Sequence, residues 1–199
     1  MNIKKNIVII PTYNESDNIA KIIEKIGFFD VDILVVDDNS PDNTSSIVKK
    51  LMSSNQRIDI LERPKKLGLG SAYRDGFKYS IDKGYNILIQ MDADFSHRID
   101  DLKNMINFID DFEVIIGSRY ISGGGSMGWS SLRKNLSKFA NIYARIITGT
   151  KVHDMTSGFR IYSSDALEKI DYSKTTSDGY GFQIEMSARA YNQQLTIKE

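Results

Sequence analysis

The first 120 residues alternate between short apolar runs and segments with helical periodicity, and this alternation constrains the fold most strongly. Ile19, Ile22, Ile23 and Ile26 recur with the i, i+3, i+4, i+7 spacing of a helix. Related patterns cover residues 47–51 and 102–109. Between them lie strand-like runs at 7–10, 33–36, 58–61, 87–90 and 113–117. Alternating strands and helices of this kind predict an α/β fold with a parallel sheet covered on both faces.

The composition narrows the function classes. With 199 residues the chain is long enough for a sizeable core, and we expect one domain spanning residues 1–199. Lys plus Arg and Asp plus Glu balance at 26 each, so no basic footprint indicates a nucleic-acid partner. The absence of cysteine excludes disulfides and thiol nucleophiles. No apolar run is long enough for a membrane span or a signal peptide, so we expect a soluble or peripheral protein.

Polar residues follow four of the expected strands, and parallel sheets bind ligands outside the carboxyl ends of their strands. The segments are PTYNES (11–16), DDNSPDNT (37–44), MDADFSH (91–97) and SRY (118–120). Any one of them fits ordinary turn chemistry, and in the second segment Ser40 or Asp42 could simply cap the next helix. Four such segments at one edge of a sheet indicate a binding site.

Asp92 and Asp94 are the sharpest feature of that edge. At i, i+2 in an extended chain their carboxylates point to the same side, where each raises the proton affinity of the other unless a cation neutralises them. A divalent metal site and a solvated turn both remain open on this pair alone. The glycine-rich LGLGSA (67–72) does not indicate a dinucleotide site, because such a motif must follow the first strand.

Taken in order, six motifs resemble one family. IPTYNESDNI, VVDDNSPDNT, KLGLGSAYRDG, MDADFSH, GSRY and DMTSGFRIY follow one another as in inverting nucleotide-sugar glycosyltransferases of GT-A fold, most closely the polyprenyl-phosphate (dolichyl-phosphate) mannose synthases. The likeness covers roughly residues 6–199. It implies a three-layer α/β/α sandwich and an enzyme that transfers mannose from GDP-mannose to a polyprenyl phosphate, with inversion and with Mg²⁺ or Mn²⁺. It also implies peripheral contact with the cytoplasmic face of a membrane.

The resemblance assigns roles to individual residues. It implies that Asp92, Asp94 and Arg119 are catalytic, with the two aspartates holding the metal and Arg119 meeting donor phosphate or sugar. Ser96 occupies the third position of the metal loop, where some relatives have glutamine, and a hydroxyl is a poorer metal ligand. Arg133 and Ser137 match the pair that receives the acceptor phosphate. The residues implied for nucleotide-sugar binding are Pro11, Tyr13, Glu15, Val36, Asp38, Asp92, Ala93, Asp94 and Arg119.

No general base is required for such an acceptor, because a phosphate monoester is already largely an oxyanion at neutral pH. Asp154, Asp178 and Glu185 are therefore candidates for the sugar pocket or for structure only. The nearest alternative function is the same transfer from UDP-glucose or another sugar nucleotide. An alternative of another class is a non-catalytic sugar-nucleotide-binding protein.

Residues 131–147 form an apolar helical stripe flanked by basic side chains. We expect the stripe to pack on the sheet with a solvated basic rim, although basic residues beside apolar surface also suit a helix on an anionic membrane. The stripe comprises Leu132, Leu136, Phe139, Ala140, Tyr143 and Ile147. The resembling enzymes continue with a basic segment that closes over the donor phosphates, whereas this sequence stops at TIKE (196–199), so we expect the chain to lack its C-terminal portion.

Overall fold

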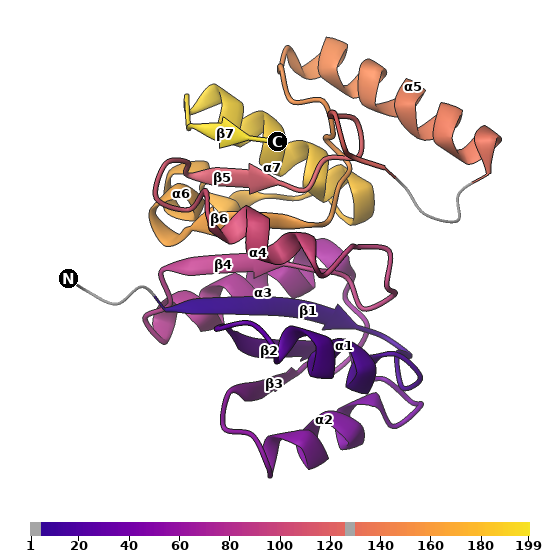
Figure 1. The fold of residues 1–199 in the computed structure, drawn as a ribbon, viewed down its shortest axis with the longest axis vertical. Coiled ribbons are helices and arrows are strands. Elements are labelled where there is room, and N and C mark those ends of the chain that lie inside the picture. Colours follow the sequence, from indigo (N-terminus) through magenta and orange to yellow (C-terminus); the bar gives the residue numbers. More distant parts are fainter. Residues whose placement is uncertain (1–4, 126–129) are drawn as a thin grey trace.

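The computed structural model describes residues 5–125 and 130–199, except for the side chain of Arg133. Its centre is one seven-stranded sheet with the order β3-β2-β1-β4-β6-β5-β7, in which only β6 runs antiparallel to its neighbours (Figure 1). The strands are β1 Asn6–Thr12, β2 Asp32–Asp37, β3 Ile58–Glu62, β4 Ile87–Gln90, β5 Val114–Ile116, β6 Arg160–Ser163 and β7 Ile197–Lys198. All five expected strands are confirmed.

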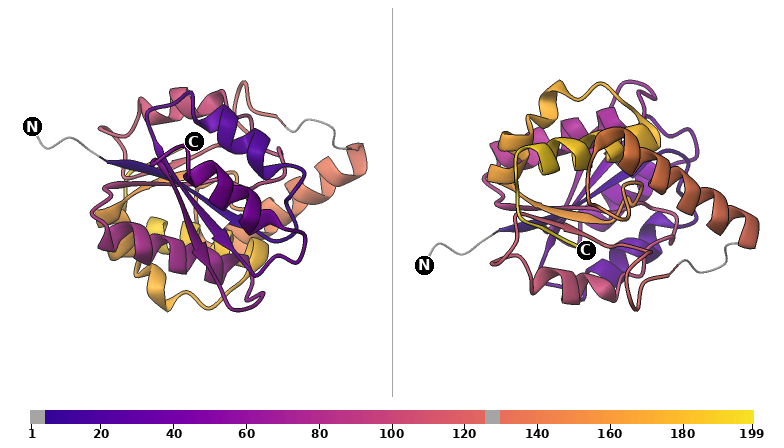
Figure 2. Two further views of the ribbon diagram at one scale, coloured as in Figure 1. Left: turned by 90° about the horizontal axis from the view of Figure 1, so that it is seen from below. Right: turned by 90° about the horizontal axis from the view of Figure 1, so that it is seen from above.

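Helices cover both faces of this sheet, so the expected three-layer α/β/α sandwich is confirmed (Figure 2). Alternate residues of each strand point to opposite faces, and the apolar residues therefore separate into two core clusters. One cluster includes side chains from α1 (Ile19–Ile26), α2 (Thr44–Met52) and α4 (Asp101–Ile106). The other includes side chains from α3 (Leu69–Asp82), α6 (Ser164–Ile170) and α7 (Gly179–Asn192). A single 3₁₀ turn, Tyr172–Lys174, joins α6 to α7 in the described chain.

The strand order brings distant segments to one edge of the sheet. β1 lies between β2 and β4, so the carboxyl ends of these three strands are neighbours. Because β6 is antiparallel, its first residue, Arg160, pairs with Gln90 of β4 and with Ile116 of β5. The segment that precedes β6, residues 153–159, therefore reaches the same edge as the ends of β4 and β5.

Helix α5 (Ser131–Thr148) departs from the expectation. It projects from the sandwich in every view (Figures 1 and 2), and the interpretation that its apolar stripe packs on the sheet is wrong. All six stripe residues are exposed, and the buried positions of the helix in the described structure are Asn141 and Ala144. The other six helices of the described chain already cover the two faces of the sheet, and α5 contributes only Ala144 to the core clusters. No helix among the described residues has the length and hydropathy needed to span a membrane.

Candidate active site

The loop that follows β4, residues 91–97, is here called the aspartate loop. Asp92 is partly exposed, and both of its carboxylate oxygens accept hydrogen bonds: Tyr73 Oη lies 3.1 Å from Oδ1, and His97 Nε2 lies 3.0 Å from Oδ2. Asp94 is exposed, and its Oδ1 accepts a hydrogen bond of 2.9 Å from the backbone N–H of Ser96. Phe95 lies between Asp94 and Ser96 and has a φ of 58°. This left-handed conformation turns the chain sharply enough to bring the Ser96 N–H to the Asp94 carboxylate.

Hydrogen bonds from His97 and Tyr73, together with the close approach of Gly158, fix the Asp92 carboxylate in place. Burial disfavours its charged form, but the hydrogen bonds from His97 and Tyr73 outweigh that effect and lower its pKa. His97 in turn stacks on Phe159, with 5.3 Å between the ring centroids. Gly158 passes so closely that a Cβ there would lie 2.6 Å from Asp92 Oδ2, so this position has no room for a side chain. Asp92 is therefore held as an oriented carboxylate.

The two loops after β1 and β2 support one another. Asp37 accepts hydrogen bonds from Thr12 Oγ1 (2.8 Å) and Ser40 Oγ (2.6 Å), and Ser40 Oγ accepts from the backbone of Asn14 (3.1 Å). Farther along, Asp42 accepts from the backbone N–H groups of Ser16 (2.9 Å) and Thr44 (3.1 Å). Asp42 thus accepts the N–H of the first residue of α2, although the N-cap position itself is Asn43, and it also holds the loop that carries Tyr13.

Glu15 adds a third carboxylate to this edge. Its pKa is raised, first by partial burial and then by the negative charges of Asp94, Asp42 and Asp92, which outweigh a hydrogen bond from Asn18. Burial is the largest cause, and the smaller contribution of the three neighbouring carboxylates shows that negative charge gathers at this edge. No three His, Asp or Glu side chains of the described residues gather into a ready metal cluster. The donor set nevertheless fits Mg²⁺ or Mn²⁺, since such ions are often held by one or two carboxylates together with substrate phosphates.

Tyr13 and Asp38, both expected at the nucleotide, differ in exposure and in their contacts. Tyr13 is 38% exposed, and Lys66 Nζ lies 3.9 Å from its ring centroid. Asp38 is buried, pairs with Arg63 at 3.1 Å and accepts the backbone N–H of Leu67 at 3.1 Å. These contacts anchor the loop on which Lys66 stands.

Three further residues expected at the nucleotide lie at the ends of strands or directly beyond them. Val36 is fully buried in the core and pairs with Pro11 of β1 and Leu61 of β3, so the structure does not expose it to a ligand. Pro11 is partly exposed near the end of β1. Ala93 is buried between the two aspartates, which leaves the backbone of the aspartate loop as its accessible part.

Arg119, just beyond β5, is engaged by a buried carboxylate. Its Nε lies 2.7 Å from Asp154 Oδ2 and one Nη lies 2.6 Å from Oδ1, while its backbone N–H donates to Oδ2 at 2.9 Å. The same Nη donates to Thr156 Oγ1 at 2.7 Å. Burial lowers the pKa of Arg119, but the hydrogen bonds and charge of Asp154 more than offset it, so the pKa is raised. Asp154 is therefore a structural partner of Arg119.

The expected acceptor residues lie on α5. Ser137 is partly buried, and its Oγ accepts a hydrogen bond of 2.7 Å from Tyr120 Oη. Arg133 is also in α5, and its side chain lies outside what the structure describes. Of the remaining carboxylates, Asp178 accepts the backbone N–H of Gly70 at 2.6 Å and Glu185 accepts that of Ser177 at 3.0 Å. Both therefore have structural partners.

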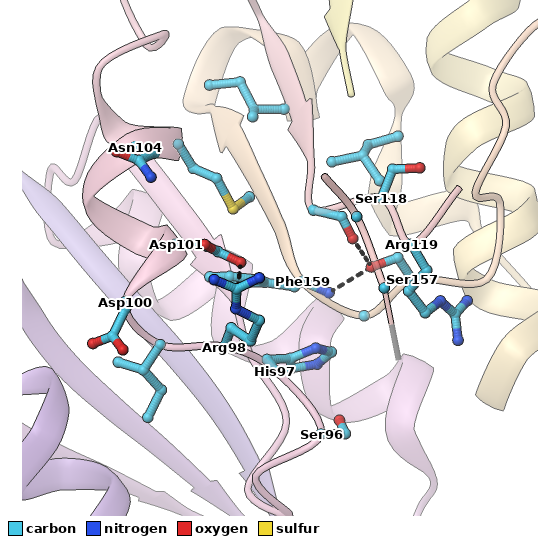
Figure 3. Close-up of a pocket in the computed structure, with 18 of the residues that line it drawn as sticks. Ser96, His97, Arg98, Asp100, Asp101, Asn104, Ser118, Arg119, Ser157 and Phe159 are labelled. Carbon is cyan, nitrogen blue, oxygen red and sulfur yellow. Dashed lines mark hydrogen bonds and ion pairs between the residues drawn. The ribbon is translucent and has the colours of Figure 1, made fainter. Parts of the chain in front are cut away.

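A groove of about 1000 Å³ connects the aspartate loop with Arg119. Its walls include Asp92, Asp94 and Ser96 on one side and Arg119 and Thr156 on the other. Figure 3 shows Ser96, His97, Ser118 and Arg119 around this space. The groove therefore joins oriented carboxylates to a held guanidinium, which are groups that suit a ligand with phosphates and a cation.

Sequence reasoning missed Tyr73, Thr156 and Lys66. Tyr73 lies in the first half of α3 and is fully buried, and nothing in the sequence indicates that its hydroxyl reaches Asp92. Thr156 and Lys66 meet their partners only through the fold. His97 had a usable signal, because it follows Asp92 by five residues in the same loop, but the sequence did not indicate that the imidazole contacts the carboxylate.

Comparison with known proteins identifies the family. The family model described as Glycosyl transferase family 2 matches residues 7–171. A polyprenol monophosphomannose synthase of Mycolicibacterium smegmatis is 41% identical over 98% of this chain and 76% of its own length. An undecaprenyl-phosphate mannosyltransferase of Micrococcus luteus is 37% identical over 92% of this chain and 76% of its own.

Solved structures share the fold at low identity. The mannosyltransferase PcManGT from Pyrobaculum calidifontis, in complex with GDP-Man and Mn²⁺, superposes with a TM-score of 0.64 at 17% identity, over 99% of this chain and 55% of that one. TarS of S. aureus gives 0.62 at 22% identity over 92% and 55%. The chain thus spans about half the length of these structures. The observed sandwich is the GT-A fold, and the chain belongs to glycosyl transferase family 2.

Proposed function

We propose that this protein transfers a mannosyl residue from GDP-mannose to a polyprenyl phosphate, with inversion of the anomeric carbon. The observation that carries the proposal is the 41% identity, over nearly the whole chain, to a polyprenol monophosphomannose synthase. The groove between the aspartate loop and Arg119 supports it, because it offers the charges that a diphosphate and a sugar need.

In this proposal the chain positions its substrates and stabilises charge. Tyr13 supplies an aromatic face for the base, and Asp92 and Asp94 hold Mg²⁺ or Mn²⁺ with the donor diphosphate. When bound, this cation acts as a Lewis acid that stabilises the charge of the departing nucleotide. Arg119, held by Asp154, meets the donor phosphate or sugar from the opposite wall. Arg133 and Ser137 orient the acceptor phosphate, whose oxyanion attacks without a general base.

A peripheral membrane position belongs to the same proposal. One side of α5 exposes seven large apolar residues, each between 44% and 79% exposed: Leu132, Leu136, Phe139, Ile142, Tyr143, Ile146 and Ile147. Lys134 and Lys138 are exposed on the same helix. An apolar face bordered by lysines suits the surface of an anionic bilayer, where a polyprenyl phosphate resides. We place this face on the cytoplasmic leaflet, where nucleotide sugars are available.

The test is a transfer assay with purified protein, Mn²⁺, labelled GDP-mannose and a short polyprenyl phosphate, with the anomer of the product assigned by NMR. We expect a β-linked lipid product from an α-linked donor. UDP-glucose is offered in parallel, because one solved structure of the S. aureus relative TarS contains UDP. Preferential use of UDP-glucose would show that the donor is UDP-glucose and not GDP-mannose. Nucleotide binding without turnover of either donor would favour the non-catalytic alternative.

The membrane position has its own test. Sedimentation with vesicles is compared between anionic and zwitterionic lipids for the wild type and for Phe139→Glu. We expect binding to the anionic vesicles alone and a large loss in the variant. Equal binding by both proteins would show that α5 is not the contact.

A further inference from the structure

Helix α5 is joined to the rest of the protein by a small polar connection centred on Asn141. Only Asn141 and Ala144 of this 18-residue helix are buried in the described structure, so apolar packing fixes its position weakly. The Asn141 amide makes three hydrogen bonds: Oδ1 accepts the backbone N–H of Met155 at 2.7 Å, and Nδ2 donates to Thr156 Oγ1 at 3.1 Å and to the Ser137 carbonyl at 2.9 Å.

The orientation of this amide is fixed by its partners. A backbone N–H can only donate and a backbone carbonyl can only accept, so Met155 and Ser137 together require the arrangement observed. Thr156 continues the connection, since its hydroxyl also accepts the 2.7 Å hydrogen bond from Arg119. One buried side chain therefore links the helix that carries Ser137 to the loop that holds Arg119.

We propose that Asn141 is a positioning residue that sets the acceptor helix in register with Arg119. This inference rests on the proposed function, in which Arg133 and Ser137 receive the acceptor phosphate. Arg133 is eight residues from Asn141 along α5, a distance of about 12 Å at 1.5 Å per residue. A tilt of about 10° at Asn141 would thus displace the Arg133 backbone by about 2 Å, and displacements of this size reduce rates strongly in positioned reactions.

Asn141 acts through other residues, so its loss should separate two activities. Attack by the lipid phosphate needs α5 in place, whereas hydrolysis of the sugar nucleotide by water does not. The pair between Arg119 and Asp154 remains intact when Asn141 is removed, because none of its hydrogen bonds involves Asn141. Donor binding and slow hydrolysis should therefore persist while mannosyl transfer falls.

The experiment compares Asn141→Ala with Asn135→Ala, the same substitution at an exposed position of the same helix. Transfer from GDP-mannose to a short polyprenyl phosphate, hydrolysis of GDP-mannose, and the donor KM are measured for each. We expect kcat for transfer to fall at least tenfold in Asn141→Ala, with hydrolysis and donor KM within twofold of wild type. Amide exchange at residues 154–157 should accelerate in this variant and remain unchanged in Asn135→Ala.

A second pair of variants tests the same inference in case Asn141→Ala folds poorly. Thr156→Val removes the bridging hydroxyl and should reproduce the loss of transfer, whereas Thr156→Ser keeps that hydroxyl and should retain transfer. Transfer kinetics within twofold of wild type in Asn141→Ala, or an equal loss of transfer, hydrolysis and donor binding, would overturn the inference. Failure of the wild type to transfer mannose would overturn the proposed function itself and the inference with it.

Discussion

Replacing Asp154 with asparagine tests how firmly the fold holds Arg119. The Asp154 side chain is fully buried and that of Arg119 is 17% exposed. Three donors of Arg119 converge on the two carboxylate oxygens at 2.6–2.9 Å. Asparagine preserves the shape, but it removes the counter-charge and directs an NH₂ group toward the donors of the arginine. The variant therefore leaves a mostly buried guanidinium without the negative charge of Asp154, although its hydrogen bond to Thr156 remains.

Breaking a buried ion pair by removing one member costs about 3–5 kcal/mol. Because Arg119 borders the groove and keeps some contact with water, we expect a loss at or just below the lower end of that range, about 2–3 kcal/mol. For a chain of this length that loss corresponds to a decrease in Tm of roughly 4–12 °C. The expected loss is thus large enough to measure by urea unfolding followed by circular dichroism.

The matched control is Asp82→Asn, which removes the carboxylate of an exposed pair with Lys78 and should not change stability measurably. The pH dependence gives a second readout. Burial raises the pKa of Asp154, but Arg119 more than offsets this and leaves it lowered, so its contribution is complete above the ordinary carboxyl pKa and is lost as the pH falls. Asp154→Asn should therefore reduce the loss of stability in acid. Equal stability of the two variants at neutral pH would refute this account of Arg119.

Four further outcomes are expected. Asp94→Asn should abolish Mn²⁺-dependent GDP binding in calorimetry while Asp111→Asn, at an exposed position outside the groove, preserves it; undiminished binding in Asp94→Asn would remove Asp94 from the metal site. Tyr13→Ala should weaken GDP binding roughly 5- to 150-fold, which corresponds to the about 1–3 kcal/mol of one stacked base, and Tyr13→Phe should not. Asp42, whose pKa is lowered to about 2 by hydrogen bonds that outweigh burial, should stabilise the fold above pH 4 and lose that contribution as the pH falls toward 2, a slope that Asp42→Asn removes in acid unfolding. Arg133→Ala should raise the acceptor KM with unchanged donor affinity, and Arg133→Lys should rescue it only partly because the bidentate fork is lost.

Strands β1, β2 and β4 could be predicted because each is a short apolar run that stays buried on both faces, whereas β6 and β7 lack such a run and were not expected. The edge of the sheet that carries the site could also be predicted, since the carboxyl ends of parallel strands meet there. The pairing of Asp154 with Arg119 could not, because these residues are 35 positions apart and meet only when β6 enters antiparallel between β4 and β5. Sequence spacing reports contacts within one element and not those that depend on strand order.

Helix α5 shows why an apolar stripe alone does not identify its partner. The same spacing of apolar residues fits a helix packed on a sheet and a helix that meets something outside the domain. The number of helices already on the sheet decides between them, and that number depends on the whole topology. The basic residues beside the stripe were the one local signal that favoured an external surface.

The two halves of the site are built with different rigidity, and this difference suits the proposed reaction. The donor half rests on loops joined by many short hydrogen bonds, through carboxylates such as Asp37 and Asp42. The proposed acceptor half stands on α5, which is fixed by the hydrogen bonds of Asn141 and Ser137 and exposes its apolar face. A water-soluble nucleotide sugar can enter a preformed pocket, whereas a lipid acceptor must be met at a surface. The hydrogen bonds of Asn141 and the one between Tyr120 and Ser137 hold this surface helix in register with Arg119, so these polar contacts join the two halves of the proposed site.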